Sequence, residues 1–166
     1  MPDIHVDTAA KTLIFADFQV SCLIGRGGGV PAADKREGDG ATPLGTYDLN
    51  TLLVRPDRRS VPETVLPWRW LAEDDGWSDA VDDPAYNRPV RHPHLHSAER
   101  LWRDDGLYDL IVTVSHNTPP VPGLGSAIFL HCTADKPHTE GCVAMAKADL
   151  LTLLAGLASD TKLLIA

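Results

Sequence analysis

The sequence has little positive charge and no long apolar run. Its 166 residues contain 15 Lys and Arg against 23 Asp and Glu, which gives a net charge of −8 without any basic stripe. Nucleic acid and anionic membranes are therefore poor partners on electrostatic grounds. The apolar segments near the start are interrupted by Asp17 and Gln19, and no basic segment precedes them, so we expect neither a signal peptide nor a membrane span. These features predict a cytoplasmic protein, or a periplasmic one if the natural chain starts further upstream.

Cysteine is also scarce. The three cysteines, Cys22, Cys132 and Cys142, are odd in number and irregularly spaced, which does not form a disulfide framework. We therefore expect free thiols in a reducing compartment. Internal repeats and a second-domain boundary are lacking too, and the composition is that of an ordinary globular protein, so we expect one domain over residues 1–166.

The residue pattern predicts a mainly β (α+β) domain with mixed sheets. Runs rich in β-branched and aromatic residues predict strands within 11–17, 18–25, 46–55, 108–115, 126–132 and 161–166. The first two runs meet at Asp17 and Phe18, where we expect a hairpin.

The remaining segments are predicted as loops and two helices. Residues 25–46 hold seven glycines and no periodicity, which predicts an extended loop, and the Pro- and Trp-rich residues 56–93 are expected to be irregular. A short helix is predicted within 97–105, with Ser97 as its N-cap. Leucines at helical spacing predict an amphipathic helix over 146–158, before the last strand.

The stretch PHTEGCVAM, residues 137–145, places Cys142 directly after a glycine, and His131 stands at the end of a predicted strand. Cysteine acyl transfer requires a thiolate, a base, and N–H donors for a developing oxyanion. We expect Cys142 to lie just before the last helix, whose free N–H groups would favour the thiolate. Gly141 would let a substrate carbonyl approach the backbone. The stretch therefore predicts a nucleophile and an oxyanion hole.

The same residues also fit a structural cysteine or a metal site. A cysteine in the apolar context CVAM is commonly a small core residue. A zinc site could use His131, Cys132, His138 and Cys142, although no C-x-x-C pair is present. Neighbouring strand residues such as His131 and Cys132 point to opposite faces, which disfavours a shared ion.

Two separated segments carry a resemblance to a known family. GSAIFLHCTADKPHTEGCVAM (residues 125–145), together with KREGDGATPLGTYDL (residues 35–49), resembles the YkuD-type L,D-transpeptidase catalytic domain. The resemblance extends from about Gly25 to the C-terminus. In that family a strand-end histidine activates a cysteine in a motif usually written Ser/Thr-His-Gly-Cys. The resemblance implies a compact YkuD-like fold that uses no cofactor and no metal.

The same resemblance implies roles for the residues of the second segment. Cys142 is the implied nucleophile and His131 its base, while Thr139 and Gly141 occupy the Ser/Thr and Gly positions of the motif. Glu140 stands where the common motif has a second histidine. It is expected to be an exposed loop carboxylate or to orient an amine of the substrate.

The resemblance further implies a peptidoglycan stem peptide, or muropeptide, as substrate. Its carboxylates require placed cations, for which Lys35, Arg36 and Arg88 are expected, with Asn87 and Asn117 as neutral hydrogen-bonding groups. Glu37 and Asp39 of the KREGDG loop are expected to form turns. The predicted activity is that of an L,D-carboxypeptidase that removes a terminal D-Ala. The alternatives are a cross-linking L,D-transpeptidase and a non-enzymatic muropeptide-binding module.

Overall fold

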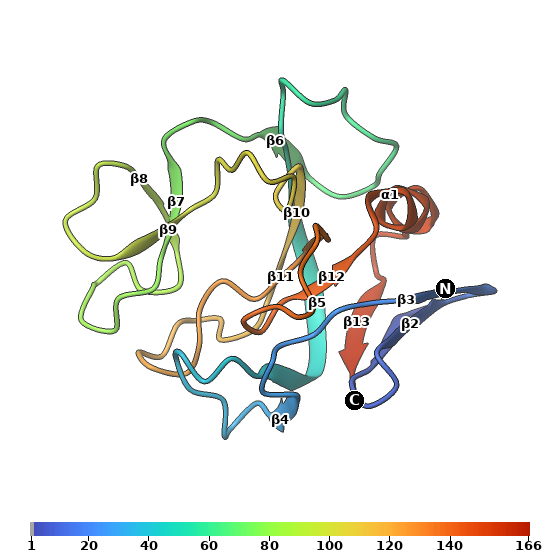
Figure 1. Ribbon diagram of the computed structural model, residues 1–166, viewed down its shortest axis with the longest axis horizontal. Coiled ribbons are helices and arrows are strands. Elements are labelled where there is room, and N and C mark those ends of the chain that lie inside the picture. The colour runs from blue at the N-terminus through green and yellow to red at the C-terminus, as the bar shows by residue number, and fades with distance from the viewer. Residues whose placement is uncertain (1) are drawn as a thin grey trace.

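The computed structural model describes residues 2–166, which form a β-rich fold with one helix (Figure 1). The elements in chain order are β1 (Ile4–Asp7), β2 (Thr12–Phe15), β3 (Phe18–Ser21), β4 (Gly29–Pro31), β5 (Thr42–Val54), β6 (Trp68–Trp70), β7 (Asp75–Ser78), β8 (Pro89–Arg91), β9 (Ala98–Arg100), β10 (Leu110–Val114), β11 (Phe129–Cys132), β12 (Val143–Met145), α1 (Lys147–Gly156) and β13 (Lys162–Ile165).

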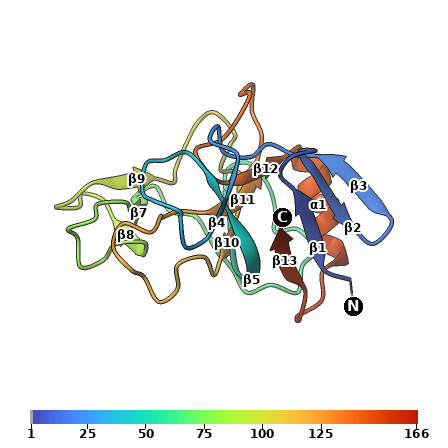
Figure 2. The same ribbon diagram turned by 90° about the horizontal axis from the view of Figure 1, so that it is seen from below.

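One large mixed sheet organises the molecule. Its strand order is β12-β11-β10-β5-β13-β1-β2-β3, with β4 and β6 also paired to β5. The long strand β5 pairs with β13 through its first half and with β10 through its second half. A separate three-stranded sheet, β8-β7-β9, lies at one end of the molecule, while α1 and the β2–β3 hairpin lie at the other (Figures 1 and 2).

The central strands are buried on both faces because each face covers a different apolar cluster. In β11, Leu130 and Cys132 point into the larger cluster, which also holds the leucines of α1, whereas Phe129 points into a smaller cluster on the opposite face. Strand β10 alternates in the same way, with Ile111 on the smaller side. This two-faced burial explains the nearly continuous apolar runs of the central strands.

Most of the expected elements are confirmed. The hairpin, the central strands, the last helix and the final strand all form, and Leu150, Leu153, Leu154 and Leu157 are buried. The fold is mainly β, as the sequence predicts.

The helix predicted within 97–105 is wrong. Residues Ala98–Arg100 form β9, which pairs with β7, and the Ser97 carbonyl accepts the N–H of Asp79 instead of capping a helix. Leu101, whose spacing indicated a helix, is fully buried at the end of this strand. Strand β7 satisfies the backbone hydrogen-bonding groups of these residues, and this pairing outweighs their local helix propensity.

The two segments expected to lack regular structure also contain strands. The loop over 25–46 contains β4 and the first residues of β5, and the irregular middle contains β6, β7 and β8. Each of these three-to-four-residue strands pairs with a distant segment, so no local period marks it in the sequence.

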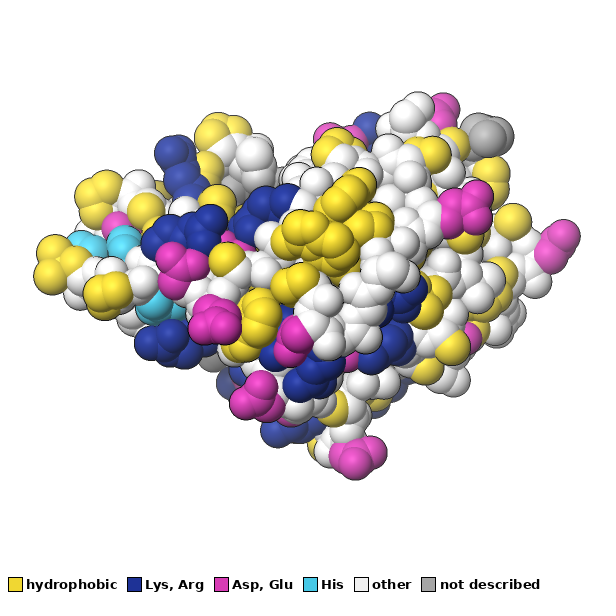
Figure 3. Space-filling view, turned by 90° about the horizontal axis from the view of Figure 1, so that it is seen from above, with side chains coloured by type: hydrophobic (Ala, Val, Ile, Leu, Met, Phe, Trp, Pro, Cys, Tyr) yellow, Lys and Arg dark blue, Asp and Glu magenta, His cyan; other side chains and the backbone are white. Residues whose placement is uncertain are grey.

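The surface carries mixed charges. On the face shown in Figure 3, Lys and Arg side chains are interspersed with Asp and Glu. Within residues 2–166, no helix has the length and apolar character that crossing a bilayer requires.

Candidate active site

Strand β11 positions the imidazole of the candidate site. Its neighbours Leu130 and Cys132 point into the larger cluster, so the alternation of the strand turns His131 to the opposite face, where it lines a cavity. His131 is only 4% exposed. Its Nδ1 lies 2.7 Å from the Cys132 carbonyl oxygen, which only accepts hydrogen bonds, so Nδ1 carries the proton and Nε2 is the free base.

A tight turn before β12 positions Cys142. The Thr139 hydroxyl donates to the Cys142 carbonyl at 2.6 Å and accepts the N–H of Gly141 at 3.1 Å. Gly141 has φ +141°, and a Cβ there would lie 2.8 Å from the Ala41 carbonyl oxygen, so this position requires glycine. The Gly141 N–H is thus bonded within the turn, and the absence of a side chain at this position allows close packing against Ala41.

The two sequence segments that carry the resemblance meet at this turn. Thr42, which is fully buried, donates its hydroxyl proton to the Gly141 carbonyl and accepts the N–H of Gly25. Gly25 also forms an isolated parallel β-bridge with Thr139. The glycine-rich loop therefore supports the cysteine turn directly, a role of Thr42 that no sequence signal indicates.

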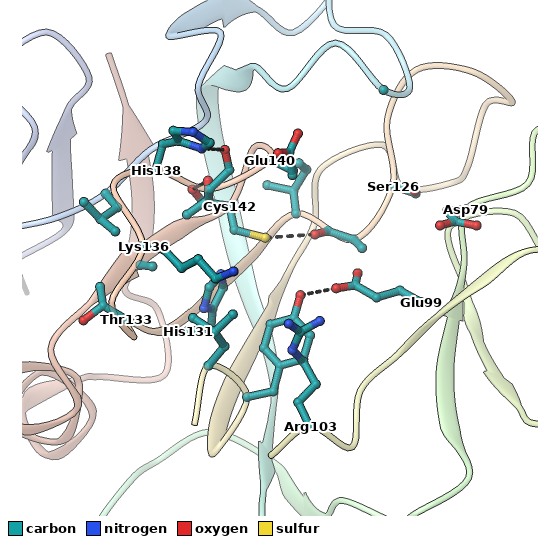
Figure 4. Close-up of a pocket in the computed structure, with 18 of the residues that line it drawn as sticks. Asp79, Glu99, Arg103, Ser126, His131, Thr133, Lys136, His138, Glu140 and Cys142 are labelled. Carbon is teal, nitrogen blue, oxygen red and sulfur yellow. Dashed lines mark hydrogen bonds between the residues drawn. The ribbon is translucent and has the colours of Figure 1, made fainter. Parts of the chain in front are cut away.

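His131 and Cys142 open into one cavity of about 500 Å³. Figure 4 shows Cys142 between two walls, with His131, Thr133 and Lys136 on one side and Glu99 and Asp79 on the other. The cavity is large enough to enclose a short peptide segment.

Burial keeps both candidate groups neutral. It lowers the pKa of His131 to about 4 and raises the pKa of Cys142 to about 12. The thiol donates to the Ala127 carbonyl at 3.1 Å, as a neutral S–H does. Near pH 7 the site therefore holds a thiol and an unprotonated imidazole.

The expectation that a helix N-terminus lowers the pKa of Cys142 is wrong. Strand β12 follows Cys142, and α1 begins only at Lys147. The thiol instead packs in the smaller apolar cluster, and desolvation there dominates its pKa.

Three of the seven residues expected to bind substrate line the cavity: Lys35, Thr139 and Glu140. Lys35 is 2% exposed and pairs with Asp39, whose carboxylate also accepts two backbone N–H groups of its turn. Glu140 is exposed and pairs with Arg26 at 2.9 Å. Asp39 therefore forms a turn, as expected from the sequence.

The other four residues are not among those that line the cavity. Arg36 donates to backbone carbonyls of its own loop, and Arg88 is exposed. Asn87 and Asn117 both have φ near +50° and use their amide groups on nearby loops. Asn87 and Asn117 thus serve loop structure.

A second group of lining residues had no signal in the sequence. Tyr108 packs edge-on against the His131 ring at 5.1 Å and donates its hydroxyl proton to Glu99. Glu99 and Arg103 lie in the segment predicted as a helix, so their orientation toward the cavity could not be foreseen. Tyr108 stands in GLYDLIV, where only its strand character was evident.

The geometry does not join the four residues considered for zinc. Cys132 points into the larger apolar cluster, away from His131. Among residues 2–166, no three His, Cys, Asp or Glu side chains lie where they could hold a metal ion.

The fold and the site define a class of protein: a β-rich domain in which a buried thiol and a neutral imidazole face one cavity. The chain belongs to the YkuD family, the L,D-transpeptidase catalytic domain, whose match covers residues 2–165. It is therefore an L,D-transpeptidase-type catalytic domain.

Solved structures share this fold at low sequence identity. Bd1075 of Bdellovibrio bacteriovorus aligns with a TM-score of 0.54 and 17% identity over 99% of this chain and 47% of its own. Pgp2, the helical cell shape determining protein of Campylobacter jejuni, aligns with a TM-score of 0.51 and 16% identity over 99% of this chain and 46% of its own. The chain thus spans about half the length of these structures. No curated protein matches the chain by sequence.

Proposed function

We propose that the protein is a cysteine acyl-transferase that acts on peptidoglycan stem peptides, with Cys142 as nucleophile and His131 as base. The observation that carries the proposal is the pair itself: a thiol and an imidazole line one cavity, and the Nδ1 proton of His131 is held by the Cys132 carbonyl. Nε2 is thereby left free to accept a proton. The family membership supports the same chemistry.

The protonation states define the order of events. Because Cys142 starts as a neutral thiol, its proton moves to His131 Nε2 as Sγ attacks the substrate carbonyl. The tetrahedral intermediate then expels the amine of the terminal D-Ala, which takes that proton, and an acyl-enzyme remains. Water attacks the thioester with His131 again accepting a proton, and this step releases the shortened peptide and regenerates the thiol.

We propose hydrolysis as the outcome, so that the protein acts as an L,D-carboxypeptidase, and we propose the cytoplasm as its location. A cross-linking transpeptidase is the second candidate, because a more open cavity of about 430 Å³ adjoins the first. The two cavities share Leu23, Thr133 and Lys136 in their walls. An acyl acceptor would need such a neighbouring site.

The direct test compares single cysteine variants on a purified tetrapeptide that ends in D-Ala. Cys142→Ala and His131→Ala should each lower D-Ala release by at least about a hundredfold. Cys132→Ala, which removes a thiol on the opposite face of β11, is the matched control and should retain activity if it folds. Full activity of the Cys142→Ala protein would refute the mechanism.

Covalent labelling distinguishes the proposed enzyme from a muropeptide-binding module that has no activity. A carbapenem, the inhibitor class associated with this family, should add its mass to Cys142. A binding module needs no reactive thiol and would stay unmodified, although it would still bind the peptide.

A further inference from the structure

The Cys142 thiol is bonded to the backbone of the segment that leads into β11. Sγ donates its proton to the Ala127 carbonyl at 3.1 Å, and the dashed line from Cys142 in Figure 4 marks this bond. The Phe129 N–H donates to the same sulfur at 3.4 Å. A carbonyl oxygen only accepts hydrogen bonds, so it stabilises a thiol and disfavours a thiolate. The two contacts therefore fix Sγ in its protonated form.

Ala127 has a backbone conformation that residues with a side chain seldom adopt. Its φ is +54°, in the left-handed region, where a Cβ is unfavourable. A residue remains in this region only where its surroundings hold it. The backbone at Ala127 therefore requires a contact from another part of the chain.

The side-chain amide of Asn87 supplies that contact. Its Oδ1 accepts the Ala127 N–H at 3.1 Å and the indole N–H of Trp77 at 2.9 Å. Its Nδ2 donates to the carbonyls of His116 and Asn117 at 3.3 and 3.2 Å. Two donors face Oδ1 and two acceptors face Nδ2, so the amide has one favourable orientation. The Ala127 N–H is thereby held in place.

Asn87 thus acts on Cys142 from outside the cavity. Ala127 and Cys142 are among the residues that line the cavity, and Asn87 is not. Ala127 is held on one side by the Asn87 amide and on the other by β11, whose first residue is Phe129. Its carbonyl consequently stays directed at Sγ. This arrangement gives Asn87 a connection to the chemistry without contact with a substrate.

The bond to Ala127 sets what must happen before Cys142 can attack. The thiol proton lies on the Ala127 carbonyl, and rotation about the Cβ–Sγ bond turns it toward His131 Nε2 without breaking a covalent bond. Only then can the imidazole accept the proton. Small electrophiles react with the thiolate and not with the thiol. The bond to Ala127 therefore also limits side reactions of the nucleophile.

We propose that Asn87 is a positioning residue which, through the Ala127 carbonyl, holds Cys142 as an oriented and unreactive thiol until substrate binds. This inference rests on the proposed function, because Cys142 is taken as the nucleophile. Loss of the Asn87 side chain should free the Ala127 carbonyl and make the thiol more reactive toward small electrophiles.

Infrared spectroscopy measures the bond between Cys142 and Ala127 directly. The S–H stretching band of Cys142 is identified as the band that is missing in Cys142→Ala. It should lie at a lower frequency than the band of an unbonded thiol, because hydrogen bonding weakens the S–H bond. Asn87→Gly removes the side chain and leaves the backbone relaxed at φ +54°, and it should shift the band to higher frequency.

Asn117→Gly is the matched control. Asn117 also has a positive φ, +52°, and its amide makes three hydrogen bonds, to Val121 and Gly125. The S–H band should keep its position in this variant. Iodoacetamide should modify Cys142 at pH 8 at least about threefold faster in Asn87→Gly than in Asn117→Gly or the unaltered protein. Mass spectrometry of the peptide that contains Cys142 measures this rate.

A Cys142 band at the frequency of an unbonded thiol in the unaltered protein would overturn the inference, whether or not the variants fold. Equal band shifts or equal alkylation rates in the two asparagine variants would also overturn it, since general loosening of the loop would then explain them. If Asn87→Gly does not fold, the band of the unaltered protein decides. These measurements do not require turnover. If the protein releases no D-Ala, the proposed function fails, and the infrared and alkylation results still decide the inference.

Discussion

Burial keeps His131 unprotonated near pH 7, and this makes the stability of the fold depend on pH. The pKa of His131 falls from 6.5 to about 4 in the folded protein because the ring is desolvated. Below pH 6.5 the unfolded chain binds a proton that the folded protein does not bind until about pH 4. The stabilisation is thus present above pH 6.5 and is lost as the pH falls toward 4.

We therefore expect His131 to lower the free energy of unfolding by roughly 2 kcal/mol between pH 7 and pH 5. Urea unfolding at the two pH values measures this difference. The His131→Asn variant, whose amide can still donate to the Cys132 carbonyl, should lose correspondingly less stability over the same interval. An equal loss in the variant would mean that His131 is not kept neutral by the fold.

At the scale of elements, the cysteine turn depends on the close approach of the loop before β4. A Cβ on Gly25 would overlap the Gly40 carbonyl oxygen and lie 3.0 Å from the Cα of Gly141. We expect Gly25→Ala to lower stability by about 1–3 kcal/mol and to lower activity further, because the turn that holds Cys142 must shift.

Gly28→Ala is the matched control for Gly25→Ala. Gly28 has φ +74° but nothing within 4 Å of an added Cβ, so this variant should lose only about 1 kcal/mol to backbone strain. Thermal unfolding measures the loss of stability in each variant, and D-Ala release measures the loss of activity. Equal activity in both variants would show that the contact with the turn is not required.

The elements that could be predicted from the sequence are those with their own pattern. Strand β10 and helix α1 each carry enough apolar residues to mark them, and the family segments located the candidate dyad. Strands β7 and β9 could not be predicted, because each forms only by pairing with a distant partner. Because residues 97–105 were predicted as a helix, the sequence did not indicate that Glu99 and Arg103 line the cavity. They reach it because residues 98–100 are extended.

At the scale of the whole molecule, the large sheet separates the larger apolar core from the candidate active site. One face covers the larger apolar cluster with α1, and the other carries the smaller cluster, Cys142 and the cavity. Cys132 and His131 are adjacent in β11 yet belong to different faces. Changes at the cavity can therefore alter chemistry without disturbing the larger core.

The fate of the acyl-enzyme depends on whether the adjoining cavity holds an amine. Water is present at roughly 55 M, so an amine competes only where a site raises its effective concentration. We expect hydrolysis to dominate, with the ratio of transfer to hydrolysis rising linearly with the concentration of an added D-amino acid. Ala134 lines the adjoining cavity and not the first one, so Ala134→Trp should leave both the ratio and D-Ala release unchanged. Mass spectrometry of the products measures the ratio. A ratio that saturates with the amine and collapses in Ala134→Trp would reveal an acceptor site and make transpeptidation the activity.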